Sequence, residues 1–178
     1  MGTAGYTTEA NAGGKLETNQ RAFEELLNSN RGIVLKVAHT YCFHDDDRAD
    51  LIQEIATQLW RAWPQYDPQR KFTTWMYRIA LNVAISFVRK EVKRRDNTVQ
   101  LDEAVHDTAD RTSHERHDEA LEQRLLEYID RQPPLDRALL LLYLEEKSQR
   151  EIAEILGLTE TNVSTKIGRL KQRIRNEM

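Results

Sequence analysis

Basic and aromatic side chains alternate in a short stretch of this 178-residue sequence. Arg70 and Lys71 are followed by Phe72, Trp75 and Tyr77. Cationic groups can follow the phosphate backbone of a single nucleic-acid strand while aromatic rings stack on its exposed bases. The stretch is therefore a candidate site for single-stranded DNA, although Phe72 and Trp75 fit core positions of a helix equally well.

A polar stripe extends this candidate site along the chain. Its members recur about every four residues, which places them on one face of a helix. They are Arg78, Asn82, Ser86, Arg89 and Lys93. We expect this face to touch duplex DNA, because it combines cations with hydrogen-bonding groups and lies away from the expected core.

The C-terminal part of the chain has the form of a helix-turn-helix, which is typical of DNA-binding proteins. Ser148 can cap a helix over 148–156 with Glu151 completing a capping box, and Gly157 can supply the positive φ of a tight turn. The next helix, from about Thr159 onward, has an inward stripe of Val163, Ile167, Leu170 and Ile174. The residues predicted to face DNA are Arg150, Thr161, Asn162, Thr165, Lys166, Arg169 and Gln172. A helical hairpin with a merely solvated basic face is the alternative.

Helices must position all of these side chains. Apolar residues recur at helical spacing over 19–43, with a break near 30–32. The next helix starts at Asp45–Asp47, whose carboxylates can cap it, and ends at Pro64. A long helix is expected over 72–94, with an inward stripe of Phe72, Met76, Ile79, Val83 and Phe87. Further helices are expected over 121–129 and 135–144, and no segment shows sustained strand alternation.

The fold class expected from these elements is all-α, with two small helical domains joined by a flexible acidic linker. The expected boundaries are a disordered leader over 1–18, an N-terminal domain over 19–95, a linker over 96–117 and a C-terminal domain over 118–178. The net charge of −3 hides a division into blocks, since both domains end in basic segments and the stretch between them is acidic. Such blocks suit two polyanion-binding modules joined by a tether that avoids polyanions.

Other kinds of chemistry find little support in the residues. Cys42 is the single cysteine, and there is neither a secretory signal nor an apolar run of membrane-spanning length, so we expect a cytoplasmic protein. His39, Cys42 and His44 lack the spacing and the fourth ligand of a metal site. No nucleophile–base pair and no glycine-rich phosphate loop occurs. We expect no enzyme, metal or cofactor; a metal-dependent helical enzyme using those three residues is an alternative that elemental analysis would test.

Several runs of the sequence resemble the extracytoplasmic-function (ECF) sigma factors of the sigma-70 family. The runs 47–55, 59–63 and 72–84 resemble their second conserved region, and the segment from Pro133 through Leu139–Leu142 to the helix-turn-helix resembles their fourth. The matches cover most of the chain from about residue 20. The resemblance implies a subunit that directs promoter-specific transcription initiation. The aromatic stretch and polar stripe would read and melt the −10 element, and the helix-turn-helix would read the −35 element.

The resemblance also implies a docking surface for core RNA polymerase. A polar stripe on the helix after Asp45 would bind the clamp helices of the polymerase, and the C-terminal domain would bind its flap. The stripe consists of Asp47, Asp50, Gln53, Glu54 and Arg61. A solvated helix face is the alternative interpretation. The linker, as in the family, would thread toward the RNA path, where its carboxylates would occupy a basic channel until RNA displaces them.

One position departs from the family pattern. Ala49 stands where the family usually carries a carboxylate, and Arg48 adds a positive charge, so docking is expected to be weak without help. A phosphate on Thr57, on the same face, would add about two negative charges, and we hypothesise activation by a Ser/Thr kinase. An anti-sigma factor is the other regulator considered. The alternative function is a stand-alone helix-turn-helix regulator with an N-terminal sensing or dimerisation domain, which would bind duplex DNA tightly without polymerase.

Overall fold

The computed structural model describes residues 20–42, 44–98, 127–129 and 131–177. Every regular element within these ranges is helical. A helix over 20–29 is followed by α2 (Arg31–Tyr41), α3 (Asp45–Ala62), a 3-10 helix (Trp63–Gln65), α4 (Phe72–Thr98), α6 (Pro134–Leu144), α7 (Gln149–Leu156) and α8 (Glu160–Glu177). The expected leader and nearly all of the expected acidic linker lie outside the described residues.

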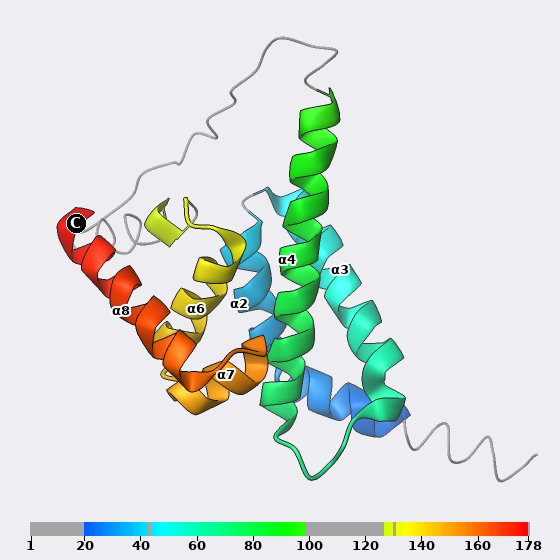
Figure 1. Cartoon of the computed structure of the whole chain (residues 1–178). Coiled ribbons are helices and arrows are strands. Elements are labelled where there is room, and N and C mark those ends of the chain that lie inside the picture. Colours follow the sequence, from blue (N-terminus) through cyan, green and yellow to red (C-terminus); the bar gives the residue numbers. More distant parts are fainter. Residues whose placement is uncertain (1–19, 43, 99–126, 130, 178) are drawn as a thin grey trace, which may run out of the picture.

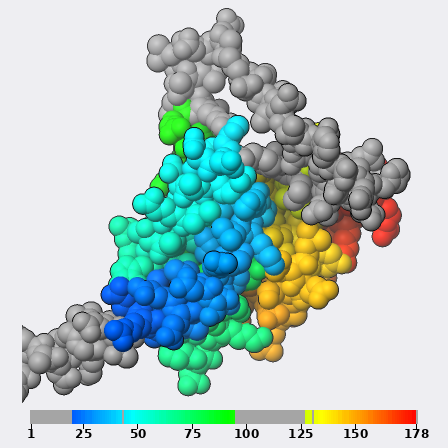
Figure 2. All heavy atoms as spheres, turned by 180° about the vertical axis from the view of Figure 1, so that it is seen from behind, coloured from blue at the N-terminus to red at the C-terminus, as the bar shows by residue number. Residues whose placement is uncertain are grey.

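The helices form two groups that meet along α4 (Figure 1). In the first group α2 and α3 pack on each other and on α4, and in the second α6 and α7 pack on α8. The two groups touch because α4 also contacts α6 and α7, and α2 contacts α6. The view from behind shows the surface of α2 directly beside that of α6 (Figure 2). The expectation of an all-α fold is confirmed.

The start of α3 differs in detail from the prediction. Asp45, Asp46 and Asp47 lie inside its first turn, whereas the N-cap is His44 and no side chain makes a capping hydrogen bond. The predicted capping by these carboxylates is therefore wrong. Carboxylates in the first turn still stabilise the positive end of the helix dipole, by roughly 0.3–1 kcal/mol each. The helix ends as expected, because a 3-10 turn containing Pro64 follows Ala62 directly.

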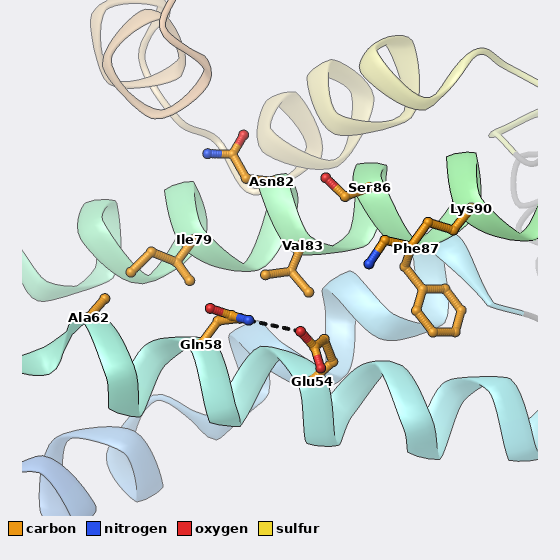
Figure 3. Close-up of a pocket in the computed structure, with 9 residues that line it drawn as sticks. All are labelled: Glu54, Gln58, Ala62, Ile79, Asn82, Val83, Ser86, Phe87 and Lys90. Carbon is orange, nitrogen blue, oxygen red and sulfur yellow. Dashed lines mark hydrogen bonds between the residues drawn. The ribbon is translucent and has the colours of Figure 1, made fainter.

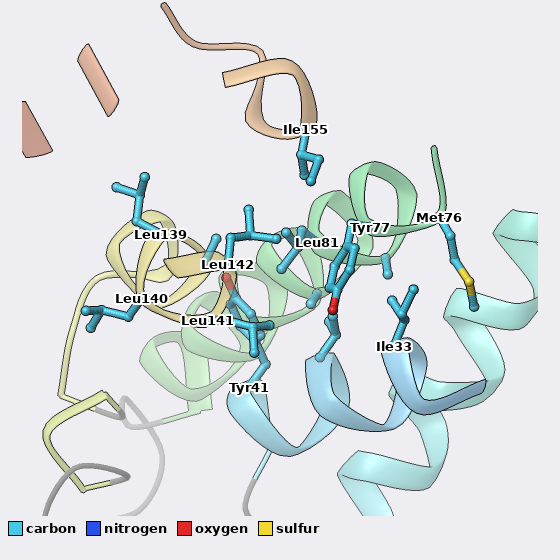
Figure 4. Packing of buried hydrophobic residues seen from close by; sticks show 14 of the residues in the cluster. Ile33, Tyr41, Met76, Tyr77, Leu81, Leu139, Leu140, Leu141, Leu142 and Ile155 are labelled. Carbon is cyan, nitrogen blue, oxygen red and sulfur yellow. The ribbon is translucent and has the colours of Figure 1, made fainter. Parts of the chain in front are cut away.

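One apolar core runs through both groups of helices. Ile155 of α7 points toward Leu81 and Tyr77 of α4 (Figure 4), and all three side chains are at most 2% exposed. Leu142 of α6 and Tyr41 of α2 belong to the same core. The two domains that the sequence predicts are therefore packed together in this structure.

The buried face of α4 is not the one that apolar spacing predicts. Phe72 and Met76 are buried as expected, but Ile79, Val83 and Phe87 are only half-buried. The fully buried line of the helix consists of Met76, Tyr77, Ala80, Leu81 and Ala84. Helices α6 and α7 pack on α4 in addition to α2 and α3, so α4 is contacted from more than one side. The helix also continues to Thr98, beyond the expected end at Arg94.

None of the helices in the described part of the chain is long and apolar enough to cross a membrane.

Candidate nucleic-acid interface

Local hydrogen bonds build the turn between α7 and α8. The Ser148 hydroxyl accepts from the Glu151 backbone N–H at 3.2 Å, and the Ser148 N–H donates to the Glu151 carboxylate at 3.1 Å. Gly157 ends α7 with φ at 67°, a conformation that an L side chain disfavours. The Thr159 hydroxyl then accepts from the Asn162 backbone N–H at 3.2 Å, which caps α8. The predicted capping box and glycine turn are confirmed.

Helix α8 has one buried face and one open face. Val163, Ile167 and Leu170 are buried, and Ile174 is half-buried, as the apolar stripe predicts. The side chains predicted to read DNA are exposed, except Lys166, which is half-buried; the exposed ones are Arg150, Thr161, Asn162, Thr165, Arg169 and Gln172. A row of hydroxyl, amide and guanidinium groups on an exposed helix can contact base edges and phosphates in a major groove.

Arg173 lies beside this row, but its side chain makes contacts within the C-terminal domain. Its guanidinium donates to Asp136 at 2.8 Å and to Gln132 at 3.3 Å. Gln132 is 9% exposed and in turn donates to the Tyr128 carbonyl at 3.1 Å. These contacts join α8 to α6 and to the segment before it, a role that the sequence did not indicate.

The polar stripe of α4 lies on its open side. Arg78, Asn82, Ser86, Arg89 and Lys93 are all exposed. Ile79 and Val83 point instead toward α3 and line a groove with Gln58 and Glu54, which are joined by a hydrogen bond of 2.9 Å (Figure 3). Asn82 and Ser86 of the polar stripe line the same groove, so the stripe borders the half-buried apolar side of α4.

Aromatic rings hold the loop before α4. The rings of Trp63 and Tyr66 stack at a centroid distance of 5.3 Å, and Trp75 lies 5.1 Å from Tyr66 and 5.4 Å from Phe72. The Tyr66 hydroxyl donates to the Arg70 carbonyl at 2.8 Å, which closes the loop. Phe72 is 9% exposed and is a core residue, whereas Trp75 is half-buried.

A cavity of about 290 Å³ opens beside these rings. Its walls include Arg70, Trp75, Arg78 and Asn82, so the structure brings together members of the aromatic stretch and the polar stripe. Glu154 of α7 also lines it. Cations, an aromatic face and an amide around one hollow form a suitable receptor for a nucleobase and its flanking phosphates.

The comparison with known proteins agrees with this geometry. Residues 26–94 match the family model described as Sigma-70 region 2, and residues 122–174 match Sigma-70, region 4. The chain is 24% identical to the ECF RNA polymerase sigma factor SigW of Bacillus subtilis over 172 residues, which cover 90% of each chain. This chain is an ECF sigma factor of the sigma-70 family. It is an RNA polymerase sigma factor and not an enzyme.

Further relatives share the sequence or the fold of this sigma factor. It is 27% identical over 165 residues to the sigma factor CnrH of Cupriavidus metallidurans, covering 88% of this chain and 86% of CnrH. The structure of CnrH in complex with the cytosolic domain of CnrY covers 89% of this chain and 91% of that chain, with a TM-score of 0.59 and 23% identity. The structure of RpoE in complex with the anti-sigma factor NepR from Bartonella quintana covers 88% and 94%, with a TM-score of 0.57 and 15% identity.

The structure places Tyr77 of this sigma factor away from any DNA surface. Its ring is 2% exposed, and its hydroxyl donates to Glu145 of the C-terminal half at 3.2 Å. Burial and the neighbouring Glu145 carboxylate raise the pKa of the Tyr77 hydroxyl. Tyr77 was predicted to contact single-stranded DNA, but in this arrangement it joins the two domains.

The predicted polymerase-docking stripe lies on the outer side of α3. Asp50, Gln53, Glu54 and Arg61 are exposed, and Asp47 is half-buried. Sequence reasoning missed Trp60, which follows Leu59 of the apolar stripe by one position. The Trp60 side chain is 45% exposed, and its ring packs edge-on against Phe23 at 5.1 Å. An exposed tryptophan beside a docking stripe is a common feature of protein interfaces.

The Thr57 side chain is half-buried at the edge of the same stripe. Its hydroxyl donates to the Gln53 carbonyl at 2.8 Å. It borders a hollow of about 400 Å³ with Asp50, Glu54, Lys90 and Glu91 among its lining residues. A phosphate at Thr57 would thus join a cluster of three carboxylates with one lysine nearby.

Cys42 and the neighbouring histidines do not form a ligand cluster in the structure. Among the described residues no three His, Cys, Asp or Glu side chains come together in a group that could hold a metal ion. The His39 ring hydrogen-bonds the Leu35 carbonyl at 2.8 Å. Burial raises the pKa of the Cys42 thiol to about 11, with a further contribution from Asp47, so the thiol is protonated at neutral pH.

Proposed function

We propose that this sigma factor reads a two-part promoter with two exposed faces on separate helices. The face of α8 around Thr165 and Arg169 enters the major groove of the −35 element, with Arg150 on a phosphate. The face of α4 around Asn82 contacts duplex DNA at the upstream edge of the −10 element. The observation that carries the proposal is that each polar face is exposed while the opposite side of its helix is packed.

We infer that the cavity beside Trp75 receives an unstacked base of the melted −10 element. The arginines and the amide in its wall supply hydrogen bonds, and Lys71 lies on the loop next to it. Stacking on an aromatic ring contributes about 1–3 kcal/mol per base, which is enough to hold a base out of the duplex. Phe72 supports this site from the core, because its ring packs against Trp75 and Tyr66.

We infer two docking sites for core polymerase, and from this role we infer a location in the bacterial cytoplasm. The outer stripe of α3, with Trp60 at its edge, binds the clamp helices. The flap fits an apolar groove of about 470 Å³ between α6 and α8, lined by Leu140, Tyr143, Leu144 and Ile174 among others. Tyr143 and Leu144 are 40% and 51% exposed, so they are available to a partner.

We propose that these docking sites are also where the protein is controlled. Two sigma factors of similar fold are known in complex with the cytosolic domain of CnrY and with the anti-sigma factor NepR. An anti-sigma factor that covers the α6–α8 groove would exclude the flap. A Ser/Thr kinase acting on Thr57 would instead strengthen the negative face of α3.

Abortive initiation from a promoter library tests the proposed function. Purified core polymerase is assayed with and without the protein, and initiation at a shared two-part promoter only when the protein is present is the expected result. Arg169→Ala should remove base preference at the −35 element alone, and Asn82→Ala should remove it at the −10 element alone. Arg21→Ala, at an exposed arginine on the helix over 20–29, is the charge-loss control and should behave as wild type.

Two results would contradict this assignment. The first is that Arg169→Ala and Asn82→Ala both lower initiation equally at every promoter, which would mean that neither face reads bases. Tight and specific binding of duplex DNA without polymerase, combined with no initiation, would instead support a stand-alone regulator.

A further inference from the structure

The exposed face of α8 contains a glycine that the fold itself does not require. Gly168 lies within the helix and is exposed, and a β-carbon built there meets no atom of the surrounding fold within 4 Å. Among the described glycines only Gly157 has a positive φ. Glycine inside a helix is less stable than alanine. Neither packing nor backbone conformation within the chain explains Gly168, so the explanation lies in what approaches this face from outside.

The side chains that precede Gly168 on its side of the helix are all short. Residues three, four and seven positions earlier share this side, because an α-helix repeats about every 3.6 residues. They are Thr165, Ser164 and Thr161, and each is exposed. The Thr165 hydroxyl donates to the Thr161 carbonyl at 2.9 Å, so its hydrogen is used within the helix. These four residues form a surface of methyl groups, hydroxyl oxygens and backbone, which we call the Gly168 patch.

Longer side chains border the Gly168 patch without covering it. Lys171 follows Gly168 by three positions, but its ammonium lies 4.3 Å from the centre of the Tyr143 ring on α6, so this cation is directed toward its own domain. Gln172 is exposed one turn after Gly168, and Arg169 is exposed on the adjacent flank of the helix. The patch is therefore open to DNA, with an amide and a guanidinium at its edges.

The chemistry of the Gly168 patch fits one group of the major groove. Base pairs present hydrogen-bond donors and acceptors there, and thymine alone adds a methyl group. Short side chains reach a base edge only when the helix backbone itself comes close, and glycine permits this close approach. Threonine methyl groups beside a bare backbone then suit the thymine methyl, which takes an apolar contact and no hydrogen bond.

We propose that Gly168 determines −35 specificity by letting α8 lie close enough to the bases to contact the methyl group of a thymine. The inference rests on the proposed function, which places α8 in the major groove of the −35 element, and it adds the base that the Gly168 patch selects. A side chain at position 168 would keep the helix away from this methyl group. Arg169 anchors the helix beside the patch through a guanine or a phosphate, so its loss removes base preference throughout the element.

Replacement of single thymines by deoxyuridine tests the contact, because deoxyuridine lacks the methyl group but forms the same base pair. The promoter is the one selected in the abortive-initiation library, and initiation is measured with limiting holoenzyme. For wild type, replacement at one or two thymines of the −35 element should lower initiation by about three- to fivefold, the effect expected for one buried methyl group. Replacement in the spacer between the two elements is the DNA control and should change nothing.

Variants at two exposed glycines test the residue itself. Gly168→Leu should lower initiation at the selected promoter, and its ratio of initiation with thymine to initiation with deoxyuridine should fall to one. Gly168→Ala should give an intermediate ratio although alanine stabilises the helix, so a loss of folding cannot explain the change. The control, Gly32→Leu, is made at an exposed glycine of α2 whose built β-carbon also meets no atom within 4 Å, and it should keep the wild-type ratio.

Three results would overturn the thymine contact while leaving the proposed function intact. They are a wild-type ratio of one at every thymine of the −35 element, a Gly168→Leu protein that keeps the wild-type ratio, and a selected −35 element with no thymine on either strand. In each case wild-type holoenzyme still initiates at a two-part promoter. Failure of wild-type protein and core polymerase to initiate at any promoter would instead overturn the proposed function and this inference together.

Discussion

Two alanine substitutions at glycines of the helix-turn-helix should change stability in opposite directions. Gly157 has φ at 67°, and Gly168 lies within α8. A β-carbon built at either position meets no atom of the surrounding fold within 4 Å, so steric conflict with packed neighbours contributes at neither. The difference between the two substitutions therefore isolates backbone conformation.

The magnitudes follow from the conformations alone. An L side chain in the left-handed region destabilises the folded state by about 1–2 kcal/mol. Alanine also restricts the unfolded chain, which offsets about 0.4–1 kcal/mol of this loss. Gly157→Ala should therefore lower the free energy of unfolding by about 1 kcal/mol. Alanine in a helix is favoured over glycine by about 0.5–1 kcal/mol, so Gly168→Ala should stabilise by that amount. The two variants should differ by about 1.5–2 kcal/mol in free energy of unfolding, which follows from adding these two values.

Urea denaturation followed by the helical circular-dichroism signal measures this difference. The transition midpoint should move down for Gly157→Ala and up for Gly168→Ala, with an unchanged dependence on urea in both. In thermal unfolding the corresponding shifts should be about 2–4 °C per kcal/mol for a chain of this size. A neutral Gly157→Ala would show that the geometry of the turn does not depend on a left-handed residue. A destabilising Gly168→Ala would contradict the open helical position described for Gly168.

Three further changes test the core, the ion pair and the regulatory site. Leu142→Ala removes a side chain that is 0% exposed and should lower the free energy of unfolding, measured by urea denaturation, by about 2–5 kcal/mol. Leu144→Ala, at a side chain that is 51% exposed, should lower it by less than about 1 kcal/mol. Equal losses for the two variants would contradict the described core. Hydrogen bonds from Lys71 and then Ser148 lower the pKa of Glu151 from 4.5 to about 2, so its stabilising contribution is complete above pH 4.5 and is lost as the pH falls toward 2. Glu151→Gln should therefore lower stability at neutral pH and flatten this acid-dependent part of the stability curve, and an unchanged slope would contradict the ion pair. Thr57→Ala should lower promoter activity in cells if phosphorylation activates the protein, and activity equal to wild type would end that hypothesis.

The helix-turn-helix could be predicted from sequence because its determinants are local. Ser148 and Glu151 are three residues apart, and the hydrogen bonds between them depend only on the first turn of α7. Gly157 likewise fixes the end of that helix through its own backbone. The inward stripe of α8 follows from the helical period, which is set by the chain itself.

The face of α4 could not be predicted in the same way, because it depends on a second domain. Apolar spacing identifies which side chains prefer burial but does not say how many neighbours a helix has. Helices α6 and α7 also pack on α4, and its fully buried line includes small residues such as Ala80 and Ala84, which give a weak periodic signal. Tyr77 was misplaced for the same reason, since a tyrosine next to a basic loop is equally suited to stacking on bases and to hydrogen bonding across an interface. The exposed Trp60 gives no periodic signal at all.

The helix-turn-helix has one side that packs toward α4 and another side that is exposed. Glu151 and Glu154 lie toward α4, whereas Arg169 lies on the exposed face of α8. The geometry of the turn is therefore independent of the contacts with α4, because the capping box and the glycine turn lie within α7 and its own connection to α8. Under the proposed function, each DNA-reading face alone would bind weakly, and polymerase would supply the fixed spacing that makes their binding simultaneous.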